Sequence, residues 1–383
     1  MRAVTESSRL HRLRELLAVF GTLGIIGFGG PAAHIGLMRR EVVERRGWLT
    51  DQQMVDLVGI TNLIPGPNST EMAMHVGRLR AGGRGLVVAG MSFILPAATI
   101  VLVLAWAYVE YGATPTGEAL LYGVKPVIIA IVLAALVAFA RTALAGPLRA
   151  VVAVGVGLLW IAGVNELVLL AGGAIAVAAV RLGTRQPWAA AGLVIPVAAA
   201  TASAASVSLL TLGAVFLKAG ALLYGSGYVL LAFLRGDLVA GLGWLTDAQL
   251  LDAVAIGQVT PGPLFTTATF IGYVLAGVPG AVVATIAIFL PAFVFVALIG
   301  PIADRVRDRP LTAALLDGVN AAALGLMAAV TVQLGREAVV DPLTIGLLGL
   351  SGAALWWGRV PSALLVAAGA GIGVGASALG LGP

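Results

Sequence analysis

One short sequence occurs twice in this chain: Gly47-Trp48-Leu49-Thr50-Asp51 returns as Gly243-Trp244-Leu245-Thr246-Asp247. At the same offset of 196 residues (243 minus 47), Pro65-Gly66-Pro67 corresponds to Pro261-Gly262-Pro263. Between residues 47–67 and 243–263, 12 of 21 aligned positions are identical, whereas composition alone would give about one or two. Chance does not explain this agreement, so the chain contains an internal duplication.

The duplication continues beyond these motifs at an offset of 195, reached by a one-residue deletion. It aligns Gly77 with Gly272, Gly82 with Gly277, Leu95-Pro96 with Leu290-Pro291, and Arg141 with Arg336. We therefore predict an N-terminal repeat at residues 1–187, a linker transmembrane helix at 188–208 and a C-terminal repeat at 209–383.

Composition places the repeats in a lipid bilayer. Hydrophobic residues make up 60% of the chain and charged residues only 11%, and the mean hydropathy is +1.02. A water-soluble domain with these values would expose large apolar patches. Apolar stretches of about the 20 residues needed to cross a bilayer recur almost from end to end, so we predict an all-α polytopic membrane protein.

Several function classes are disfavoured by residue types that are missing or scattered. The chain has no Cys and only three His residues, His11, His34 and His75, so neither a thiolate nor a His-based metal site is expected. No cofactor is expected either. The net charge of +5 belongs to loops between apolar segments, which indicates membrane orientation rather than nucleic-acid binding.

Loop charges indicate that the two halves have opposite orientations. The connection with Arg78, Arg80 and Arg84 corresponds to the uncharged stretch 273–280, whereas 109–118, which holds only acidic charges, corresponds to the Arg-rich stretch 304–309. Because cytoplasmic loops are enriched in Lys and Arg, this exchange predicts an inverted-topology repeat. We expect a multi-pass protein of the plasma (inner) membrane with a cytoplasmic N-terminus.

The same orientation requires that segments 14–46 and 50–80 each enter and leave the bilayer on one side. Each segment contains a helix breaker, Gly29-Gly30-Pro31 in the first and Pro65-Gly66-Pro67 in the second. Broken hairpins are therefore predicted, since irregular backbone at membrane depth survives where it is buried or lines a cavity. The alternative is one full span followed by an amphipathic surface helix.

Each Pro-Gly-Pro sequence predicts a helix start inside the membrane. Such a start presents unpaired N–H groups and the positive end of the helix dipole, which suits an anion. In the first copy Asn68-Ser69-Thr70 follow as capping residues, and in the second Thr266-Thr267 follow after two apolar residues. A single such break would fit a kinked helix without a ligand, but two breaks in an inverted repeat favour a midplane binding site.

Ionisable residues within apolar segments are candidates for function, and Lys125 and Lys218 are the strongest. Both would attract a dianion, although Lys125 could instead extend to the interface. Asn62 and Gln258 are equivalent amides three residues before each Pro-Gly-Pro, able either to donate to an oxyanion or to satisfy broken backbone.

Other polar residues leave alternatives open. The equivalent Asp56 and Asp252 could serve proton coupling or lie near the interface, and Glu71 and His75 form either a coupling pair or a hydrated pair. Trp48 and Trp244 are interpreted as interfacial anchors, with the following Thr or Asp capping a helix.

The predicted substrate-binding residues share a position at a helix break or a charge within an apolar segment: Gly29, Gly30, Pro31, Asn62, Pro65, Gly66, Pro67, Asn68, Ser69, Thr70, Lys125, Lys218, Gly225, Gln258, Pro261, Gly262, Pro263, Thr266 and Thr267. No catalytic residue is predicted.

With these motifs in this order, duplicated, the chain resembles the chromate ion transporter family of the long-chain, two-domain type. The resemblance is carried by Phe28-Gly29-Gly30-Pro31, Gly47-Trp48-Leu49, Pro65-Gly66-Pro67 and Leu95-Pro96, and by their counterparts in the second half. It covers essentially the whole chain. The second copy departs from the pattern with Tyr224-Gly225-Ser226-Gly227, so the resemblance does not imply two equal sites.

The resemblance implies export of chromate from the cytoplasm, with sulfate as its structural analogue. The residues themselves suit any tetrahedral dianion, so uptake of sulfate or another oxyanion stays open. An intramembrane enzyme acting on a phosphate-bearing lipid is a distant alternative, because the paired acids or His-based site that it would need are not evident in the sequence. The expected partners are the oxyanion and the lipid bilayer, with monomer and homodimer both open.

Overall fold

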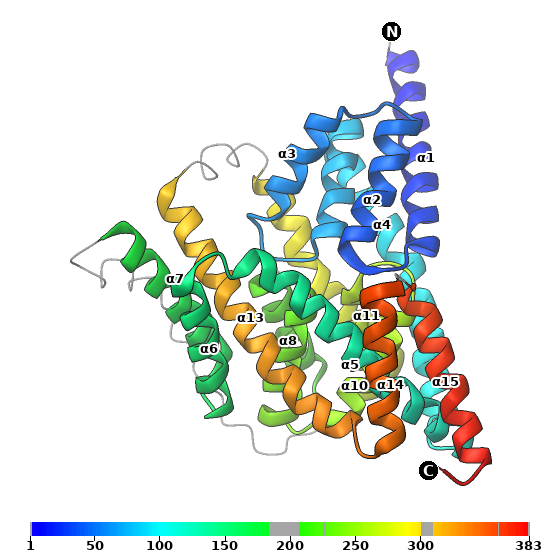
Figure 1. Ribbon diagram of the computed structural model, residues 1–383. Coiled ribbons are helices and arrows are strands. Elements are labelled where there is room, and N and C mark those ends of the chain that lie inside the picture. The colour runs from blue at the N-terminus through cyan, green and yellow to red at the C-terminus, as the bar shows by residue number, and fades with distance from the viewer. Residues whose placement is uncertain (1, 184–206, 225–226, 300–308, 359, 382–383) are drawn as a thin grey trace.

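A computed structural model describes residues 2–183, 207–224, 227–299, 309–358 and 360–381, which form helices joined by short turns and contain no strand. The predicted linker helix at 188–208 lies almost entirely outside these residues. Within the described ranges the predicted all-α architecture is confirmed (Figure 1).

The first half contains seven α-helices and one π-helical turn. They are α1 (Arg2–Ile26), α2 (Gly30–Arg39), η1 (Arg40–Arg45), α3 (Asp51–Thr61), α4 (Asn68–Tyr111), α5 (Pro115–Ala143), α6 (Pro147–Ile161) and α7 (Glu166–Leu182).

The described part of the second half repeats this order. It consists of α8 (Leu209–Leu222), η4 (Gly227–Val229), α9 (Leu230–Leu234), η5 (Arg235–Gly241), α10 (Asp247–Val259), η6 (Leu264–Thr266), α11 (Thr267–Ile299), α13 (Pro310–Ala338), α14 (Pro342–Ala353), η7 (Ala354–Gly358) and α15 (Ser362–Ala378).

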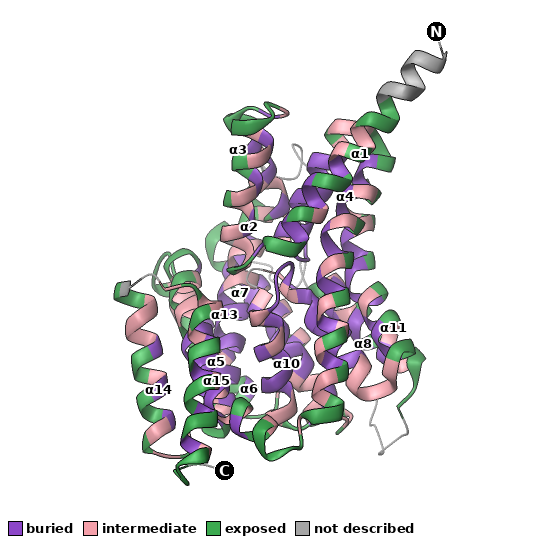
Figure 2. Ribbon diagram, turned by 90° about the vertical axis from the view of Figure 1, so that its right-hand side faces the viewer, coloured by how far each residue is buried: buried purple, intermediate pink, exposed green. Residues whose placement is uncertain are grey.

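Four of the described helical segments are long and apolar enough to cross a membrane: Asn68–Tyr111, Pro115–Ala143, Leu264–Ile299 and Pro310–Ala338. Outer helices such as α14 turn exposed residues away from the molecule, while the buried residues of α5, α10 and α13 face its middle (Figure 2). The outward residues include Val151, Leu210 and Leu350, which are 71%, 85% and 72% exposed. Apolar side chains at that exposure suit contact with lipid.

The duplication reappears in the backbone of α4 and α11. Each helix is kinked at an Ala-Gly pair whose dihedral angles agree: Gly82 has φ 65° and ψ −152°, and Gly277 has φ 60° and ψ −152°. Only glycine adopts this conformation without strain. Beside each kink a second glycine pair lets the two limbs touch, because a Cβ on Gly77 or Gly272 would collide with the carbonyl oxygen of Gly85 or Gly280.

The C-terminal helices of each half pack on the other half. Helix α15 lies against α5 and α7 lies against α13, so each half packs its C-terminal helix on the other. Small residues make both contacts close, since a Cβ on Gly123 would collide with the carbonyl oxygen of Gly369 and one on Gly318 with that of Gly173. The halves are therefore intertwined rather than merely adjacent.

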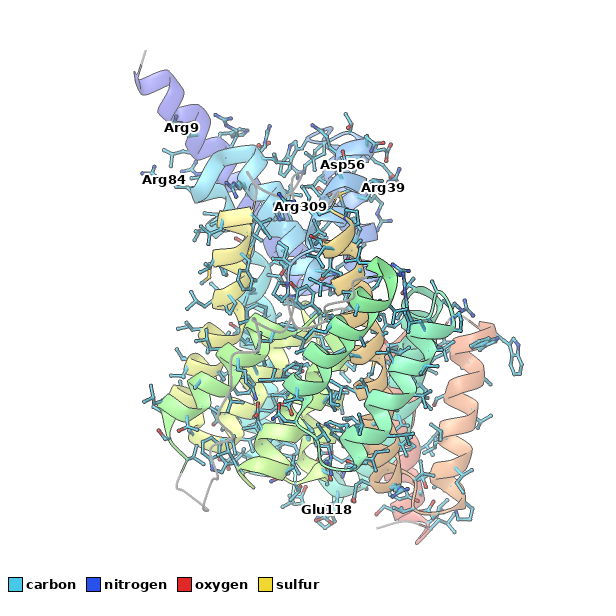
Figure 3. The ribbon with its side chains drawn as sticks, turned by 90° about the vertical axis from the view of Figure 1, so that its left-hand side faces the viewer. Arg9, Arg39, Asp56, Arg84, Glu118 and Arg309 are labelled. Carbon is cyan, nitrogen blue, oxygen red and sulfur yellow. The ribbon has the colours of Figure 1, made fainter. Side chains whose placement is uncertain are left out.

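The segments predicted as broken hairpins do reverse direction. Helix α1 runs inward to a break at residues 27–29, and α2 returns beside it (Figure 1). Helix α3 runs inward to Pro65-Gly66-Pro67, and the first limb of α4 returns to the end of the molecule that carries Arg39 and Arg84 (Figure 3).

Candidate functional site

Two kinds of helix start can be compared within each half. Helices α3 and α10 begin with capping boxes in which the side chains of Thr50 and Thr246 accept from the backbone N–H groups of Gln53 and Gln249, and each Gln side chain accepts in return. This confirms the capping interpretation of the repeated Trp-Leu-Thr-Asp motif.

The helices that follow the two Pro-Gly-Pro breaks differ in this respect. Pro67 and Pro263 occupy the N-cap positions of α4 and η6, and neither start has a side-chain cap. All six residues of the breaks are buried. An uncapped helix start in an apolar interior leaves N–H groups that need a partner, so both starts are suited to receive an anionic ligand.

The glycine of each break is bonded to the opposite half. Gly66 N–H donates to the carbonyl of Leu223 at 2.8 Å, and Gly262 N–H donates to the carbonyl of Gly27 at 2.8 Å. Leu223 and Gly27 are equivalent in the duplication, and each ends the first helix of its half. These two N–H groups are therefore already bonded in this conformation. The N–H groups at 70 and 266 are bonded too, to the carbonyls of the last proline of each break, which leaves residues 68, 69, 264 and 265 as backbone donors for a substrate.

Close packing explains why both positions are glycine. Gly66 has φ 141° and Gly262 has φ 92°, values that L side chains rarely adopt. A Cβ on Gly66 would come within 3.6 Å of Ala292 Cβ and collide with a carboxyl oxygen of Glu71, and one on Gly262 would lie 2.5 Å from Ala97 Cβ. Ala97 and Ala292 are also equivalent, so α4 and α11 each press on the break of the other half.

The hydroxyl groups after the breaks are held differently in the two copies. Thr266 donates to the carbonyl of Pro263 at 2.9 Å and Thr267 to that of Leu264 at 2.8 Å. In the first copy Ser69 and Thr70 are buried, and Thr70 Oγ1 has no hydrogen-bond partner among the described residues. The first copy thus keeps a free hydroxyl at its helix start.

The two equivalent amides have different surroundings. Asn62 is exposed and accepts from the side chain of Asn68 at 2.9 Å, whereas Gln258 is partly buried and accepts from the Tyr228 hydroxyl at 3.1 Å. Both amides lie at the ends of helices that lead into the breaks.

The break of the α1–α2 hairpin also depends on glycine. Gly29 and Gly30 have φ 101° and 77°, and Pro31 lies in the first turn of α2. His34 packs its Nε2 atom 2.8 Å from the Gly27 carbonyl, the same carbonyl that accepts from Gly262. The counterpart Gly225 lies outside the described residues.

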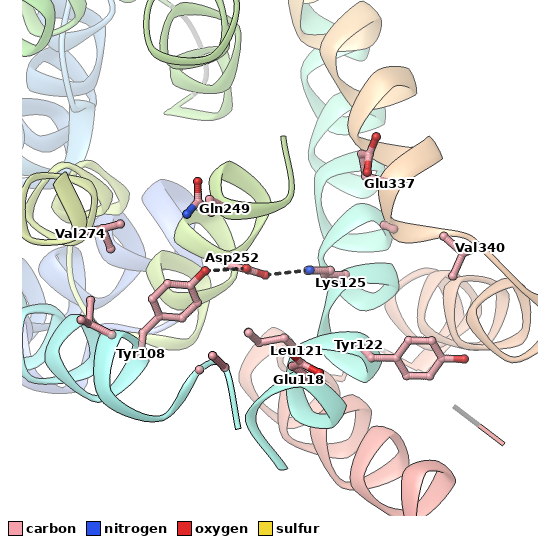
Figure 4. A pocket seen from close by; sticks show the side chains of 14 residues that line it. Tyr108, Glu118, Leu121, Tyr122, Lys125, Gln249, Asp252, Val274, Glu337 and Val340 are labelled. Atoms are coloured by element: carbon pink, nitrogen blue, oxygen red, sulfur yellow. Dashed lines mark hydrogen bonds and ion pairs between the residues drawn. The ribbon is translucent and has the colours of Figure 1, made fainter. Parts of the chain in front are cut away.

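Lys125 lies in a cavity of about 560 Å³ and is paired with a carboxylate (Figure 4). Its ammonium group lies 3.4 Å from Asp252 Oδ1, and the hydroxyl of Tyr108 donates to Asp252 Oδ2 at 3.0 Å. The wall also holds Glu118 and Glu337, so acidic groups outnumber basic ones around this cavity.

Another acidic residue lies beside this cavity. Tyr122, another wall residue, donates to Asp341, and this hydrogen bond holds the pKa of the Asp341 carboxyl below its usual range. Asp341 lies at the N-cap of α14, between the apolar spans, and stays ionised there.

Lys218 is engaged by two carboxylates. Its ammonium group lies 2.5 Å from Asp237 Oδ1 and 3.2 Å from Glu166 Oε1, where Glu166 begins α7 of the other half. Both predicted lysines therefore join the halves through ion pairs. Neither Glu166 nor Tyr108 is predictable from the sequence as a site residue, because their partners are more than 50 residues away in the chain. An acid at the start of an apolar helix was the available signal for Glu166.

The opposite end of the molecule is basic. Arg9, Arg12, Arg80 and Arg84 line a cavity of about 580 Å³ between α1 and the kink of α4. Figure 3 places Arg9, Arg39, Arg84 and Arg309 at this end and Glu118 at the other.

Long apolar spans, outward apolar faces and helices broken at buried, uncapped starts define a multi-pass membrane transporter. The chromate transporter family profile matches residues 14–206 and 210–374. The chain belongs to the chromate transporter family.

Relatives cover nearly the whole chain. The chromate transport protein of Cupriavidus metallidurans is 35% identical over 355 residues, which cover 90% of this chain and 88% of the relative. The probable chromate transport protein of Synechococcus elongatus is 32% identical, with 93% of each chain covered. The chromate transport protein of Pseudomonas aeruginosa is 34% identical, with 87% of this chain and 84% of the relative covered. No solved structure gives a significant match.

Proposed function

We propose that this protein exports chromate across the plasma (inner) membrane and holds the oxyanion at the two Pro-Gly-Pro helix starts. The observation that carries the proposal is the contrast in capping: α3 and α10 have complete capping boxes, whereas α4 and η6 start buried and without side-chain caps. A dianion in an apolar interior needs many donors to replace its water. We infer the identity of the substrate from relatives that are named as chromate transport proteins.

The donors that we assign are the N–H groups after each break and the nearby polar side chains. In the first half they come from residues 68 and 69 and from Asn62, and in the second half from residues 264 and 265 and from Gln258, because the N–H groups of residues 70, 266 and 267 are bonded to backbone carbonyls. Lys125 and Lys218 belong to the same proposal as cations that would exchange a carboxylate partner for the oxyanion during the cycle. Gly29-Gly30-Pro31 would shape the walls, and Gly225, the counterpart in the second half, stays a prediction from the sequence.

Charge distribution supports the direction of transport. The cavity lined by four arginines lies at the end of the molecule that, by the enrichment of Lys and Arg in cytoplasmic loops, faces the cytoplasm. The cavity at the other end is mainly acidic. A basic mouth raises the local concentration of an anion, which suits capture of the substrate from the cytoplasm.

We further propose that residues 1–187 and 209–383 form an inverted-topology repeat joined by a linker helix. Equivalent connections at the ends of α4 and α11 support it, since Glu118 lies at one end of the molecule and Arg309, which corresponds to Thr114, at the other. Such an arrangement would let one half alternate against the other around a fixed site.

The test is transport by the purified protein in liposomes, with chromate, sulfate, molybdate and phosphate compared under an imposed membrane potential. We expect chromate to be transported fastest and its movement to follow the potential. Inside-out and right-side-out membrane vesicles then give the direction, with accumulation expected in the inside-out preparation. Transport of sulfate without chromate, or accumulation only in right-side-out vesicles, contradicts the proposal and favours oxyanion uptake.

A further inference from the structure

A carboxyl group lies directly behind the first Pro-Gly-Pro break. Glu71 is in the first turn of α4, is completely buried, and directs its carboxyl group at Gly66, where a Cβ would collide with Oε1. Neither carboxyl oxygen has a hydrogen-bond partner among the described residues. A buried side chain with two unsatisfied acceptors is rare in proteins and calls for an explanation.

The groups around Glu71 do not neutralise a negative charge. Across from it, the loop after α8 contributes Tyr224, whose hydroxyl points to the carbonyl of Leu63 at 3.4 Å. From α11, Ala292 lies against the same glycine, Gly66. No described Lys, Arg or His forms an ion pair with Glu71.

The remaining ionisable groups described in this region form no ion pair with Glu71. On α4 itself, His75 is buried one turn further on with Nε2 unpartnered, and Arg78 donates to the carbonyls of Val296 and Ala297 at 2.5 and 3.0 Å. His34 of α2 is turned to the Gly27 carbonyl and the ring of Phe93. An ionised carboxylate in this setting would lack both water and a counter-charge, so the geometry favours the neutral, protonated acid.

We propose that Glu71 is a proton-binding residue whose protonation permits the oxyanion to occupy the adjacent helix start. The inference rests on the proposed function, because it takes the oxyanion to bind beside Gly66. In the buried conformation one carboxyl oxygen of Glu71 carries a proton taken up from water, and this proton returns to water when the emptied site opens to solvent. A deprotonated Glu71 would place a like charge beside the dianion, so proton and oxyanion bind together.

The second half has no carboxyl group at the corresponding positions. The positions that correspond to Glu71 at the two repeat offsets are Thr266 and Thr267, both neutral and both hydrogen-bonded within their own turn. The proton site is therefore built into one half only.

The experiment compares chromate binding by the purified wild type, Glu71→Gln and Glu110→Gln from mildly acidic to mildly alkaline pH. Glu110→Gln is the matched control, since it makes the same change at an exposed position of α4. Titration of chromate itself changes the pH dependence of binding equally for all three proteins. For the wild type and the control we expect an additional loss of affinity with rising pH, approaching about tenfold per pH unit where one linked proton is released. Glu71→Gln should lack this additional loss.

An identical pH profile for Glu71→Gln and the wild type would overturn the inference. If the wild type binds no chromate at any pH, the proposed function fails instead, and the proton site is tested by infrared difference spectroscopy. There we expect a protonated-carboxyl band that Glu71→Gln lacks and Glu110→Gln keeps; a band unchanged in Glu71→Gln overturns the proton site. If Glu71→Gln does not fold, Glu71→Asp is measured instead, and we expect its protonated-carboxyl band to be shifted from that of the wild type. An unshifted band contradicts the assignment of the proton to Glu71.

Discussion

The two Pro-Gly-Pro breaks share a backbone but differ in chemistry. Each glycine donates to the end of the first helix of the other half, and each packs on an alanine of the opposite long helix. Behind Gly66, however, lies a buried carboxyl group, whereas behind Gly262 the threonine hydroxyls are bonded locally. Duplication preserved the scaffold, and the side chains on it diverged.

This difference indicates separate tasks for the halves. A symmetric scaffold supplies two helix starts that can face one ligand, and the asymmetric residues decide what charge accompanies that ligand. Lys125 and Lys218 follow the same rule, since their equivalents are Asn320 and Thr22. Variants that make the halves more alike, or that damage one half at a time, test this division.

The largest expected effect concerns the orientation of the two halves in the membrane, because each labelled position should react from one side only. Single cysteines in this Cys-free chain can be placed at Gly83 and Val278, exposed beside the kinks of α4 and α11, and at Thr116 and Leu311, exposed in the first turns of α5 and α13. An inverted repeat predicts that the variants at 83 and 311 react with an impermeant thiol reagent from the cytoplasmic side only, and those at 116 and 278 from the other side only. Labelling of the equivalent positions 83 and 278 from the same side would show parallel halves.

The next effect concerns the break glycines. Gly66→Ala and Gly262→Ala should each lower transport at equal protein amount by at least about tenfold, because strain at such dihedral angles costs about 1–3 kcal/mol before any clash is added. Gly21→Ala is the control, since nothing lies within 4 Å of a Cβ there.

Combining Gly66→Ala with Glu71→Ala should restore part of the folded yield, since the carboxyl group in the way is removed. Full transport by either single variant would show that the breaks tolerate side chains.

A smaller effect is expected from the lysines, measured as thermal unfolding in detergent. Lys218→Ala leaves Glu166 and Asp237 together without a cation, which should lower the free energy of unfolding by about 3 kcal/mol. Lys125→Ala leaves Asp252 still bonded to Tyr108, so about half that loss is expected.

Double variants separate structure from transport. Lys125→Ala with Asp252→Asn should recover stability, yet transport should stay low if Lys125 contacts the substrate. Lys125→Arg should restore only part of the transport, because the guanidinium group is larger and planar. Full transport by the neutral double variant would assign the pair to structure alone.

The smallest effect separates the two amides. Gln258→Glu should weaken the apparent affinity for chromate by on the order of 1 kcal/mol, roughly fivefold, because a like charge is placed beside the anion in a partly buried position. Asn62→Asp should weaken it less, since Asn62 is exposed to solvent. Gln52→Glu on the exposed outer part of α3 serves as the control. Equal affinities for Gln258→Glu and the wild type would place the oxyanion elsewhere.

The sequence by itself determined the repeat, the helical membrane class and the positions of the breaks. A run of about 20 apolar residues favours a membrane-spanning helix, and Pro-Gly-Pro interrupts a helix. Both effects depend only on neighbouring residues, so they are the same wherever the segment lies in the fold. The capping role of Thr50 was readable for the same reason, because a capping box spans only four residues.

Tertiary structure alone decided which groups meet across the two halves. The Leu223 and Gly27 carbonyls take the N–H groups of the breaks, α15 packs on α5, and Lys218 finds Glu166 at a separation of 52 residues. These contacts depend on how intertwined helices pack, and no local pattern encodes a partner so distant. Burial of Glu71 without a partner is of the same kind, since it results from the packing of Gly66, Tyr224 and Ala292 around one carboxyl group.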